Sequence, residues 1–481
     1  MEKYKKLFSN TGIYAIGTFA SKFLVFFMLP FYTACLLPEE YGTADLISQT
    51  ANLIIPFACS GISDGIFRFA MDKNEDKKKV FSSGITVLLV CSAVFLILSP
   101  LIGLYPTLQS HVWLVVLYVL AANFHSAVAQ YIRALEKTVL FSVGGILGTA
   151  ITVAFNIVFL LGLDMGVEGY ILSVILGDVL VTAFLLPVSG VWRDISFRLA
   201  DKEKIRQMLK YSIPMIPTTI FWWITSVADR FMIISMKGAE INGLYAAAYK
   251  APTLLTLVCT VFIEAWQLSA VSENDETERS VFFGKVFAGF QGVLFMAASA
   301  LVMCSKLVTE ILLADSYYDS WQYIPVLSLA MTYSSLVTFL GSVYMVRKKS
   351  IYSFLTAAVG AVVNVVLNFV LIPHWSAMGA AVATFFSYFV VMVIRGINTR
   401  RFVRFKLGVP ILVFNTAAVV LQGGIMIAEP TWWVPAQLIL FAAVLVINGK
   451  NILHAVILAL RNYRGKNNPA KGENYGTEDQ N

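Results

Sequence analysis

Charged side chains are scarce in this sequence, and their scarcity excludes most classes of protein. Of the 481 residues, 14% are charged and 58% are hydrophobic, whereas about 25% are charged in an ordinary soluble domain. This composition excludes a soluble globular protein, a disordered chain and a coiled coil. The longest stretch between apolar runs is 189–210, which leaves no room for a catalytic domain outside a membrane.

Cysteine and histidine are also few. The five cysteines all lie in or at the ends of apolar runs, and none forms a Cys-x-x-Cys pair. We therefore expect them to act as small apolar packing residues. The four histidines show no spacing typical of metal ligands, so we expect neither a metal site nor a cofactor.

Long apolar runs take up most of the sequence. They are about 20 residues long, which is the length needed to cross a hydrocarbon core of about 30 Å. The runs predict an all-α, polytopic membrane protein with about 14 transmembrane helices. The predicted spans are 9–35, 41–68, 80–104, 111–133, 139–161, 167–188, 211–236, 242–270, 282–307, 322–346, 351–373, 377–397, 407–428 and 432–458.

The distribution of basic residues predicts the orientation. Thirty of the 36 Lys and Arg residues lie on the side of the N-terminus, whereas the opposite loops are acidic, as in Pro38-Glu39-Glu40. By the positive-inside rule, both termini are in the cytoplasm of a multi-pass protein of the cell (inner) membrane. The net charge of +7 thus reflects orientation, and we expect no nucleic-acid partner.

Two polar segments separate or follow the spans. Residues 189–210 interleave basic and apolar side chains, which predicts either a short amphipathic helix on the membrane surface or a plain basic linker. Residues 461–481 are polar, and we expect a disordered cytoplasmic tail.

The two halves of the chain resemble each other. Glu39-Glu40-Tyr41-Gly42 corresponds to Glu240-Ile241-Asn242-Gly243, and Asn156 corresponds to Asn368. A unit of six spans gives two copies with the same orientation, a layout found in transporters whose site lies between the halves. The predicted parts are an N-lobe (1–190), an amphipathic linker (191–210), a C-lobe (211–400), two added helices (401–460) and the tail (461–481).

Several short motifs, taken in order, resemble a known family. They are Asn10-Thr11-Gly12, Leu37-Pro38-Glu39-Glu40-Tyr41-Gly42, Gly61-Ile62-Ser63-Asp64-Gly65, Arg133-Ala134-Leu135-Glu136-Lys137-Thr138, Ala228-Asp229-Arg230-Phe231 and Tyr245-Ala246-Ala247-Ala248-Tyr249-Lys250. The sequence resembles the Wzx-type polysaccharide and oligosaccharide flippases of the MOP superfamily, whose relatives include the lipid II flippase MurJ and the MATE drug antiporters. The resemblance implies a V-shaped pair of lobes around a cationic cavity and export of undecaprenyl-diphosphate-linked sugars.

Charged residues inside the spans point to the same kind of site. A charge at a helix centre costs about 2.5–3.5 kcal/mol, so these residues should face the interior of the bundle or a water-filled cavity. The candidates for binding a diphosphate are Lys22, Arg68, Arg230 and Lys250. The candidates for lining the cavity or for coupling are Asp64, Asp178, Asp229, Thr18, Asn52, Tyr249 and Glu264.

Some of these charges have a second interpretation. Asp64 and Arg68 are four residues apart and could instead pair with each other along one helix. Asp229 and Arg230 are adjacent, so at least one of them needs a partner on another helix, and Lys250 is the candidate for Asp229.

Together these features predict a transporter rather than an enzyme. It would flip a lipid-linked (undecaprenyl-diphosphate) oligosaccharide from the cytoplasmic to the outer leaflet by alternating access. Lys22 has no acidic neighbour at helical spacing and is the strongest candidate for contacting the diphosphate through charge-assisted hydrogen bonds. The sequence is compatible with three driving forces: a proton gradient, a sodium gradient or the membrane potential.

The expected partners are the lipid-linked glycan, the bilayer and, in the same process, a glycan polymerase or glycosyltransferases. We expect the protein to act as a monomer. The alternative is a MATE-like, cation-coupled multidrug antiporter, which would require an anionic cavity and fewer spans. An integral-membrane glycosyltransferase or polymerase would require a long outward loop, and the stretches near 105–111 and 308–321 are too short.

Overall fold

The computed structural model describes residues 26–72, 74–272, 276–347 and 349–466, and these residues contain helices but no β-strand. The α-helices are α2 (Leu29–Cys35), α3 (Pro38–Ala58), α4 (Ile62–Ala70), α5 (Lys77–Leu98), α6 (Val112–Ala134), α7 (Thr138–Asn156), α8 (Gly166–Ser189), α9 (Lys202–Ser212), α10 (Ile216–Lys237), α11 (Ala239–Ser272), α12 (Glu276–Met303), α13 (Ser305–Leu312), α14 (Ile324–Val346), α15 (Ser350–Asn398), α16 (Val409–Ala428) and α17 (Trp433–Lys466).

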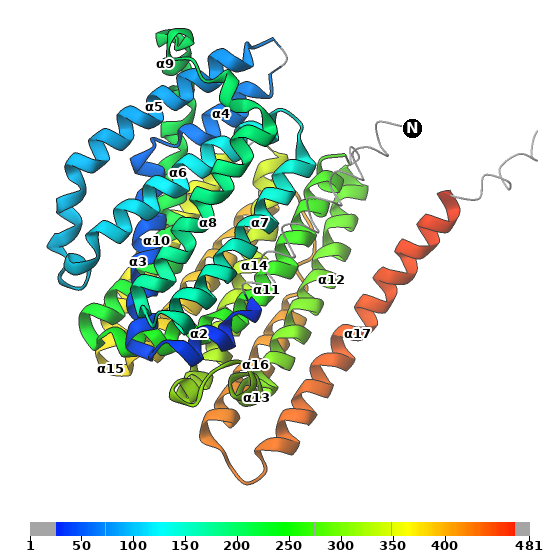
Figure 1. Cartoon of the computed structure of the whole chain (residues 1–481). Coiled ribbons are helices and arrows are strands. Elements are labelled where there is room, and N and C mark those ends of the chain that lie inside the picture. Colours follow the sequence, from blue (N-terminus) through cyan, green and yellow to red (C-terminus); the bar gives the residue numbers. More distant parts are fainter. Residues whose placement is uncertain (1–25, 73, 273–275, 348, 467–481) are drawn as a thin grey trace, which may run out of the picture.

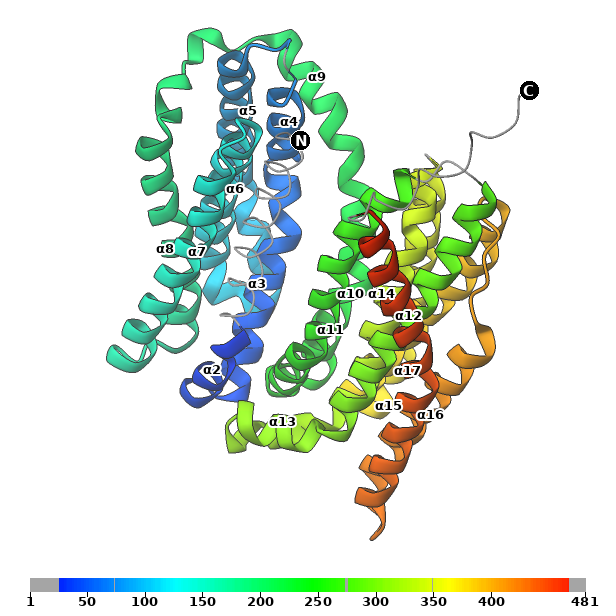
Figure 2. The same cartoon turned by 90° about the vertical axis from the view of Figure 1, so that its right-hand side faces the viewer.

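The helices form two bundles (Figure 1). Helices α2 to α8 make up the N-lobe, α10 to α15 make up the C-lobe, and α16 and α17 pack on the C-lobe against α12. Figure 2 shows that the lobes meet at the end that carries α2 and α13 and stand apart toward the end that carries α9. We call these the α13 end and the α9 end. The all-α fold with a V-shaped pair of lobes and two added helices is confirmed.

Many of the helices are long and apolar enough to cross a membrane. In the described part of the chain eight pass this test, and the pair α3 and α4, bent by 56°, makes up to nine. Every expected span from the second to the fourteenth contains a helix, whereas most of the first (9–35) lies outside the described residues. The chain is therefore a multi-pass membrane protein, and the number of fourteen spans stays a prediction.

Helix α15 contains a break at the position where the sequence predicts the end of one span and the start of the next. Ser376 has φ +53° and ψ −139°, three residues after Pro373. Proline has no N–H to continue a helix, and Lys237 Nζ donates a hydrogen bond to the Pro373 carbonyl oxygen at 2.9 Å. The segment therefore consists of two helices joined by a tight break.

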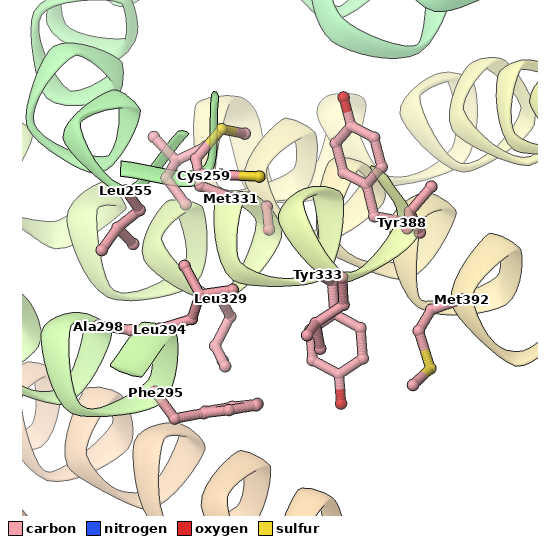
Figure 3. Close-up of a cluster of buried hydrophobic side chains, with 14 of the residues drawn as sticks. Leu255, Cys259, Leu294, Phe295, Ala298, Leu329, Met331, Tyr333, Tyr388 and Met392 are labelled. Carbon is pink, nitrogen blue, oxygen red and sulfur yellow. The ribbon is translucent and has the colours of Figure 1, made fainter. Parts of the chain in front are cut away.

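Each lobe has its own apolar core. The C-lobe core includes Leu255, Cys259, Phe295, Met331 and Tyr388, which come from α11, α12, α14 and α15 (Figure 3). Cys259 is 4% exposed and packs among these side chains, as the sequence predicts for its cysteines.

The linker between the lobes is anchored to the N-lobe. Lys204 Nζ of α9 lies 2.7 Å from Glu75 Oε1, and Lys79 Nζ lies 3.0 Å from Asp201 Oδ2. The hydrogen bond from the Lys79 ammonium lowers the pKa of Asp201 below its usual value. Of the predicted segment 189–210, only the part within α9 is α-helical; two short 3₁₀ turns precede it.

Candidate functional site

The lobes touch where α3 and α11 cross near the α13 end. A Cβ atom on Gly42 would lie 2.0 Å from the Ala239 carbonyl oxygen, and one on Gly243 would lie 1.8 Å from the Pro38 carbonyl oxygen. Asn242 Nδ2 donates a buried hydrogen bond of 2.9 Å to the Gly42 carbonyl oxygen. Because real Cβ atoms do not approach other atoms below 3.0 Å, only glycine permits this crossing at both positions.

A second set of contacts closes the same end of the molecule. The Tyr317 hydroxyl donates to the Leu36 carbonyl oxygen at 2.8 Å, and the Ala314 N–H donates to Thr33 Oγ1 at 3.1 Å. Tyr317 lies in the 3₁₀ segment Asp315–Tyr323 of the C-lobe, whereas Thr33 and Leu36 belong to the N-lobe. The lobes are thus joined by one buried and one partly buried hydrogen bond as well as by the helix crossing.

An ion pair connects the lobes one helical turn further from the α13 end. Arg230 Nε of α10 lies 2.9 Å from Asp45 Oδ2 of α3, and Arg230 Nη1 lies 3.3 Å from Asp229 Oδ1. The guanidinium also lies 4.4 Å from the centre of the Tyr249 ring and 5.6 Å from that of Tyr245. Arg230 is 5% exposed, so its charge is compensated by two carboxylates and two aromatic faces.

The second carboxylate of this cluster belongs wholly to the C-lobe. Asp229 is fully buried and accepts hydrogen bonds from the Tyr245 hydroxyl at 2.5 Å and from Thr384 Oγ1 at 3.3 Å. The expected pairing of Asp229 with Lys250 is wrong, because Asp229 points into the C-lobe and uses these hydroxyls and Arg230 instead. The residue on another helix that completes the cluster is Asp45, opposite Arg230.

Lys250 lines a cavity of about 330 Å³ between the lobes. In the described part of the chain no carboxylate lies within 4 Å of Lys250 Nζ, and the charges that act on it from further away are Asp45 and Arg230. The other lining residues come from both lobes: Phe26, Leu29, Tyr32, Tyr41, Thr149, Tyr170, Thr253, Leu254, Thr256 and Leu257.

Hydroxyl groups around Lys250 keep free hydrogen-bonding capacity. Thr253 Oγ1 donates to the Lys250 carbonyl oxygen at 2.5 Å, and Thr256 Oγ1 donates to the Thr253 carbonyl oxygen at 2.7 Å. Both oxygens can still accept, since a hydroxyl has two lone pairs. Tyr32 OH accepts from Asn156 Nδ2 at 3.2 Å and keeps its own hydrogen to donate. The cavity can therefore bind an anion at the ammonium and polyhydroxyl groups beside it.

Three other predicted site residues lie apart from this cavity. Asn52, Asp64 and Arg68 are exposed, and none of them is among the residues that line it. The charged groups of Asp64 and Arg68 are not within 4 Å of each other among the described ion pairs. The alternative intrahelical pair is thus not formed in this structure.

The remaining candidates have separate surroundings. Asp178 of α8 is near His125 of α6, whose Nδ1 lies 3.2 Å from Thr182 Oγ1. This places Asp178 within the N-lobe. Tyr249 is 8% exposed and contributes its ring face to Arg230 rather than a hydroxyl to the cavity.

Some candidates cannot be placed. Lys22 and Thr18 lie outside the described residues, and so does the side chain of Glu264.

Sequence reasoning missed a buried arginine. Arg395 is 1% exposed; its Nε donates to Thr356 Oγ1 at 2.9 Å and its Nη1 to the Val337 carbonyl oxygen at 2.8 Å. Its guanidinium lies 5.4 Å from the centre of the Trp222 ring. Arg395 lies inside the C-lobe and ties α10, α14 and α15 together.

Comparisons with known proteins identify a matching family and a similar membrane protein. Residues 7–267 match the family model described as "Polysaccharide biosynthesis protein". A curated relative is an uncharacterized membrane protein, MJ1375, of Methanocaldococcus jannaschii. It is 22% identical over 389 residues, which cover 74% of this chain and 89% of that protein.

Two solved structures share the fold. One is the lipid II flippase MurJ in an inward closed conformation, with a TM-score of 0.70, 14% identity, and coverage of 92% of this chain and 99% of that chain. The other is an inward-facing multidrug resistance MATE family transporter of the MOP superfamily, with a TM-score of 0.61, 14% identity, and coverage of 79% and 94%. At this identity the likeness shows the common fold.

Proposed function

Because the chain belongs to the polysaccharide biosynthesis protein family and is a multi-pass membrane transporter of the MOP superfamily, we propose that it flips an undecaprenyl-diphosphate-linked oligosaccharide. The movement is from the cytoplasmic to the outer leaflet, and it supplies a cell-surface polysaccharide. The matched family and its structural neighbours are transporters rather than enzymes, and in our proposal the chain catalyses no chemical reaction.

The main support for the proposal is the position of Lys250 in the cavity between the lobes. This lysine is a cation without a carboxylate partner among the described residues, in a cavity of about 330 Å³ lined by both lobes. A diphosphate supplies the missing negative charge through charge-assisted hydrogen bonds. Thr253 and Thr256 lie one and two turns further along the same face, where they can accept hydrogen bonds from sugar hydroxyls.

The proposed orientation makes the α9 end cytoplasmic, in the inner membrane, with both termini in the cytoplasm. In this orientation the Gly42–Gly243 crossing and the Asp45–Arg230 pair close the outer side, and substrate arrives from the side on which the lobes stand apart (Figure 2). Rocking of the lobes would open the outer side and separate Asp45 from Arg230. The substrate anion can then take the place of the Asp45 carboxylate beside Arg230.

The membrane potential favours this direction of transport. Outward movement of an anion from a negative cytoplasm is favoured by about 2.3 kcal/mol per charge per 100 mV. Coupling to protons or sodium ions would use the carboxylate of the buried Asp229 or of the half-buried Asp45 or Asp178, and the proposal does not depend on it.

The test is a flipping assay with full-length protein in proteoliposomes that contain a fluorescent undecaprenyl-diphosphate disaccharide. We expect Lys250→Ala to lower the rate of flipping about tenfold or more, since one charge-assisted contact is worth about 1.5–3 kcal/mol, and Lys250→Arg to keep part of the activity. Lys210→Ala, which removes an exposed lysine of α9, is the matched control. Normal flipping by Lys250→Ala at a normal protein level would overturn the proposal.

A MATE-like multidrug antiporter remains the second candidate, because the acids and bases of the central cluster balance. Asp45 and Asp229 carry two negative charges, and Arg230 and Lys250 carry two positive ones, so the site is formally neutral rather than strongly cationic. Uptake of a cationic dye driven by a sodium or proton gradient, with no flipping of the lipid-linked sugar, would favour this candidate.

A further inference from the structure

A basic hollow lies at the α9 end of the C-lobe, away from the central cavity. Two adjoining depressions of about 540 and 800 Å³ share Ser280, Arg400 and Arg404. Lys349 and Arg401 line the first, and Lys285 and Lys406 line the second. None of these residues lines the cavity that contains Lys250.

The chain presents these cations by an alternating pattern. Residues 403–407 alternate in burial, as side chains do along extended backbone: Val403, Phe405 and Leu407 are buried in the C-lobe core, while Arg404 and Lys406 are exposed between them. Extended backbone points successive side chains to opposite sides. Two hydrogen bonds hold the segment: Arg347 Nη2 donates to the Phe402 carbonyl oxygen at 3.0 Å, and Ser280 Oγ donates to that of Arg404.

Three arginines of the hollow have no acidic partner in the part of the chain that the structure describes. Among the described residues no carboxylate lies within 4 Å of Arg400, Arg401 or Arg404. Several cations gathered around one open depression favour an anion, and a phosphate suits arginine because the guanidinium binds it in a bidentate manner.

An apolar groove of about 550 Å³ leads away from the hollow, and Arg400 lines both. Its other lining residues are mostly apolar and include Phe389 and Met392 of α15 and Val413 and Val420 of α16. The groove follows α16 from Val409 to Val420, which is about 16 Å at 1.5 Å per residue. This is close to the thickness of one leaflet, half of a hydrocarbon core of about 30 Å.

Tyr333 of α14 forms the floor of this groove. Its hydroxyl is 2.7 Å from Thr416 Oγ1, so both polar groups are satisfied and the groove stays apolar along its length. Figure 3 shows Tyr333 and Met392 beside each other at the edge of the C-lobe core.

We propose that the hollow and the groove together bind one anionic glycerophospholipid of the membrane leaflet at the α9 end. The phosphate lies on Arg400, Arg401 and Arg404, and an acyl chain fills the groove beside α16. Basic pockets between transmembrane helices on the cytoplasmic side bind anionic head groups in this way. A zwitterionic lipid fits less well, because its ammonium group would enter the same cationic hollow. The lipid would hold α16 against α15.

The test is a titration of full-length protein in detergent, read by native mass spectrometry, with dioleoylphosphatidylglycerol and dioleoylphosphatidylcholine. We expect R400Q/R401Q/R404Q to weaken binding of phosphatidylglycerol about tenfold or more and to leave binding of phosphatidylcholine unchanged. The control R198Q/K202Q/R206Q removes three exposed cations of the linker and should change neither affinity.

A second variant tests the acyl chain separately from the charges. Ala417 is exposed and lines the groove, so Ala417→Trp should fill the groove and lower phosphatidylglycerol binding although every cation remains. Ala154→Trp, on the exposed face of α7, is the matched control. Thermal unfolding checks that each variant is folded, and Val413→Trp replaces Ala417→Trp where that variant is not recovered.

Three outcomes would overturn the proposal. The first is equal binding of both lipids by the wild-type protein. The second is displacement of phosphatidylglycerol by equimolar inorganic phosphate, which would show a simple phosphate site. The third is tighter binding of undecaprenyl phosphate at the same residues, which would assign the groove to a polyprenyl lipid.

Discussion

Gly42 of α3 and Gly243 of α11 lie against each other, so that a Cβ atom on Gly42 would be 2.7 Å from the Gly243 backbone nitrogen. The two glycines are also equivalent positions of the sequence repeat, at the ends of Glu39-Glu40-Tyr41-Gly42 and Glu240-Ile241-Asn242-Gly243. Each half of the chain thus supplies a glycine from the equivalent position of the repeat to the same helix crossing.

Replacing either glycine should open the α13 end. In Gly42→Ala and Gly243→Ala the added Cβ would meet backbone atoms 2.0 and 1.8 Å away, which cannot move without separating the helices. We expect lower transport, and greater labelling by a water-soluble maleimide of a cysteine placed at Leu36, which is buried in this state. The five native cysteines are first replaced by serine or alanine.

Gly424→Ala is the control for this experiment. A Cβ on Gly424 would meet nothing within 4 Å, and alanine favours a helix over glycine by about 1 kcal/mol. This variant should be neutral or slightly more stable. Unchanged labelling at Leu36Cys in Gly42→Ala would show that the crossing does not control access.

Arg230 should matter for stability as well as for transport. Arg230→Ala leaves the buried carboxylates of Asp45 and Asp229 without their counter-charge, which costs about 3–5 kcal/mol. Asp45→Asn should cost less, because Asp229 still compensates Arg230. Thermal unfolding of the purified variants measures both effects, and Asp45→Asn added to Arg230→Ala should restore part of the loss. An unfolding temperature of Arg230→Ala equal to that of the wild type would contradict this.

Lys22 remains the strongest sequence-based candidate for the diphosphate, although it lies outside the described residues. Lys22→Ala should sharply reduce glycan export while the protein still inserts, because Lys22 has no acidic neighbour at helical spacing in the sequence that its removal would leave without a counter-charge. Lys22→Arg should keep part of the activity, and Lys22→Glu should be worse than alanine. Complementation of a flippase-null strain, with the membrane protein level measured in parallel, is the readout; normal export by Lys22→Ala would refute the assignment.

The orientation can be tested with reporter fusions. Fusions after residues 75, 200, 348 and 402 should report the cytoplasm, and fusions near 39, 164, 239 and 317 should report the outside. The structure brings members of the second group together, since Gly42 contacts Ala239 and Tyr317 bonds to Leu36. An external reading at 200 would overturn both the orientation and the six-plus-six repeat.

Helix positions could be predicted from the sequence because apolar runs and basic loops act locally. The break near Ser376 follows from Pro373 and a short polar interruption. These inferences need only the length of a membrane span and the period of a helix.

Contacts between distant helices could not be predicted in the same way. Asp45 and Arg230 lie on different lobes, and with several embedded acids available their pairing depends on how the lobes meet. Arg395 lies near the end of the predicted span 377–397, and its burial could not be predicted, because its partners Val337 and Thr356 come from two other segments. Burial in a helical bundle depends on neighbours that hydropathy does not reveal.

The helix crossing at Gly243 also has a mechanical consequence. Helix α11 continues from Gly243 to Ser272, a distance of about 44 Å at 1.5 Å per residue. With the crossing as a fulcrum, a rotation of about 10°, comparable to known rigid-body rotations, would move the far end by about 8 Å. A small displacement beside the glycines is therefore enough to change the distance between the lobes at the α9 end by about 8 Å. The helix that moves in this way, α11, is also the helix that carries Lys250.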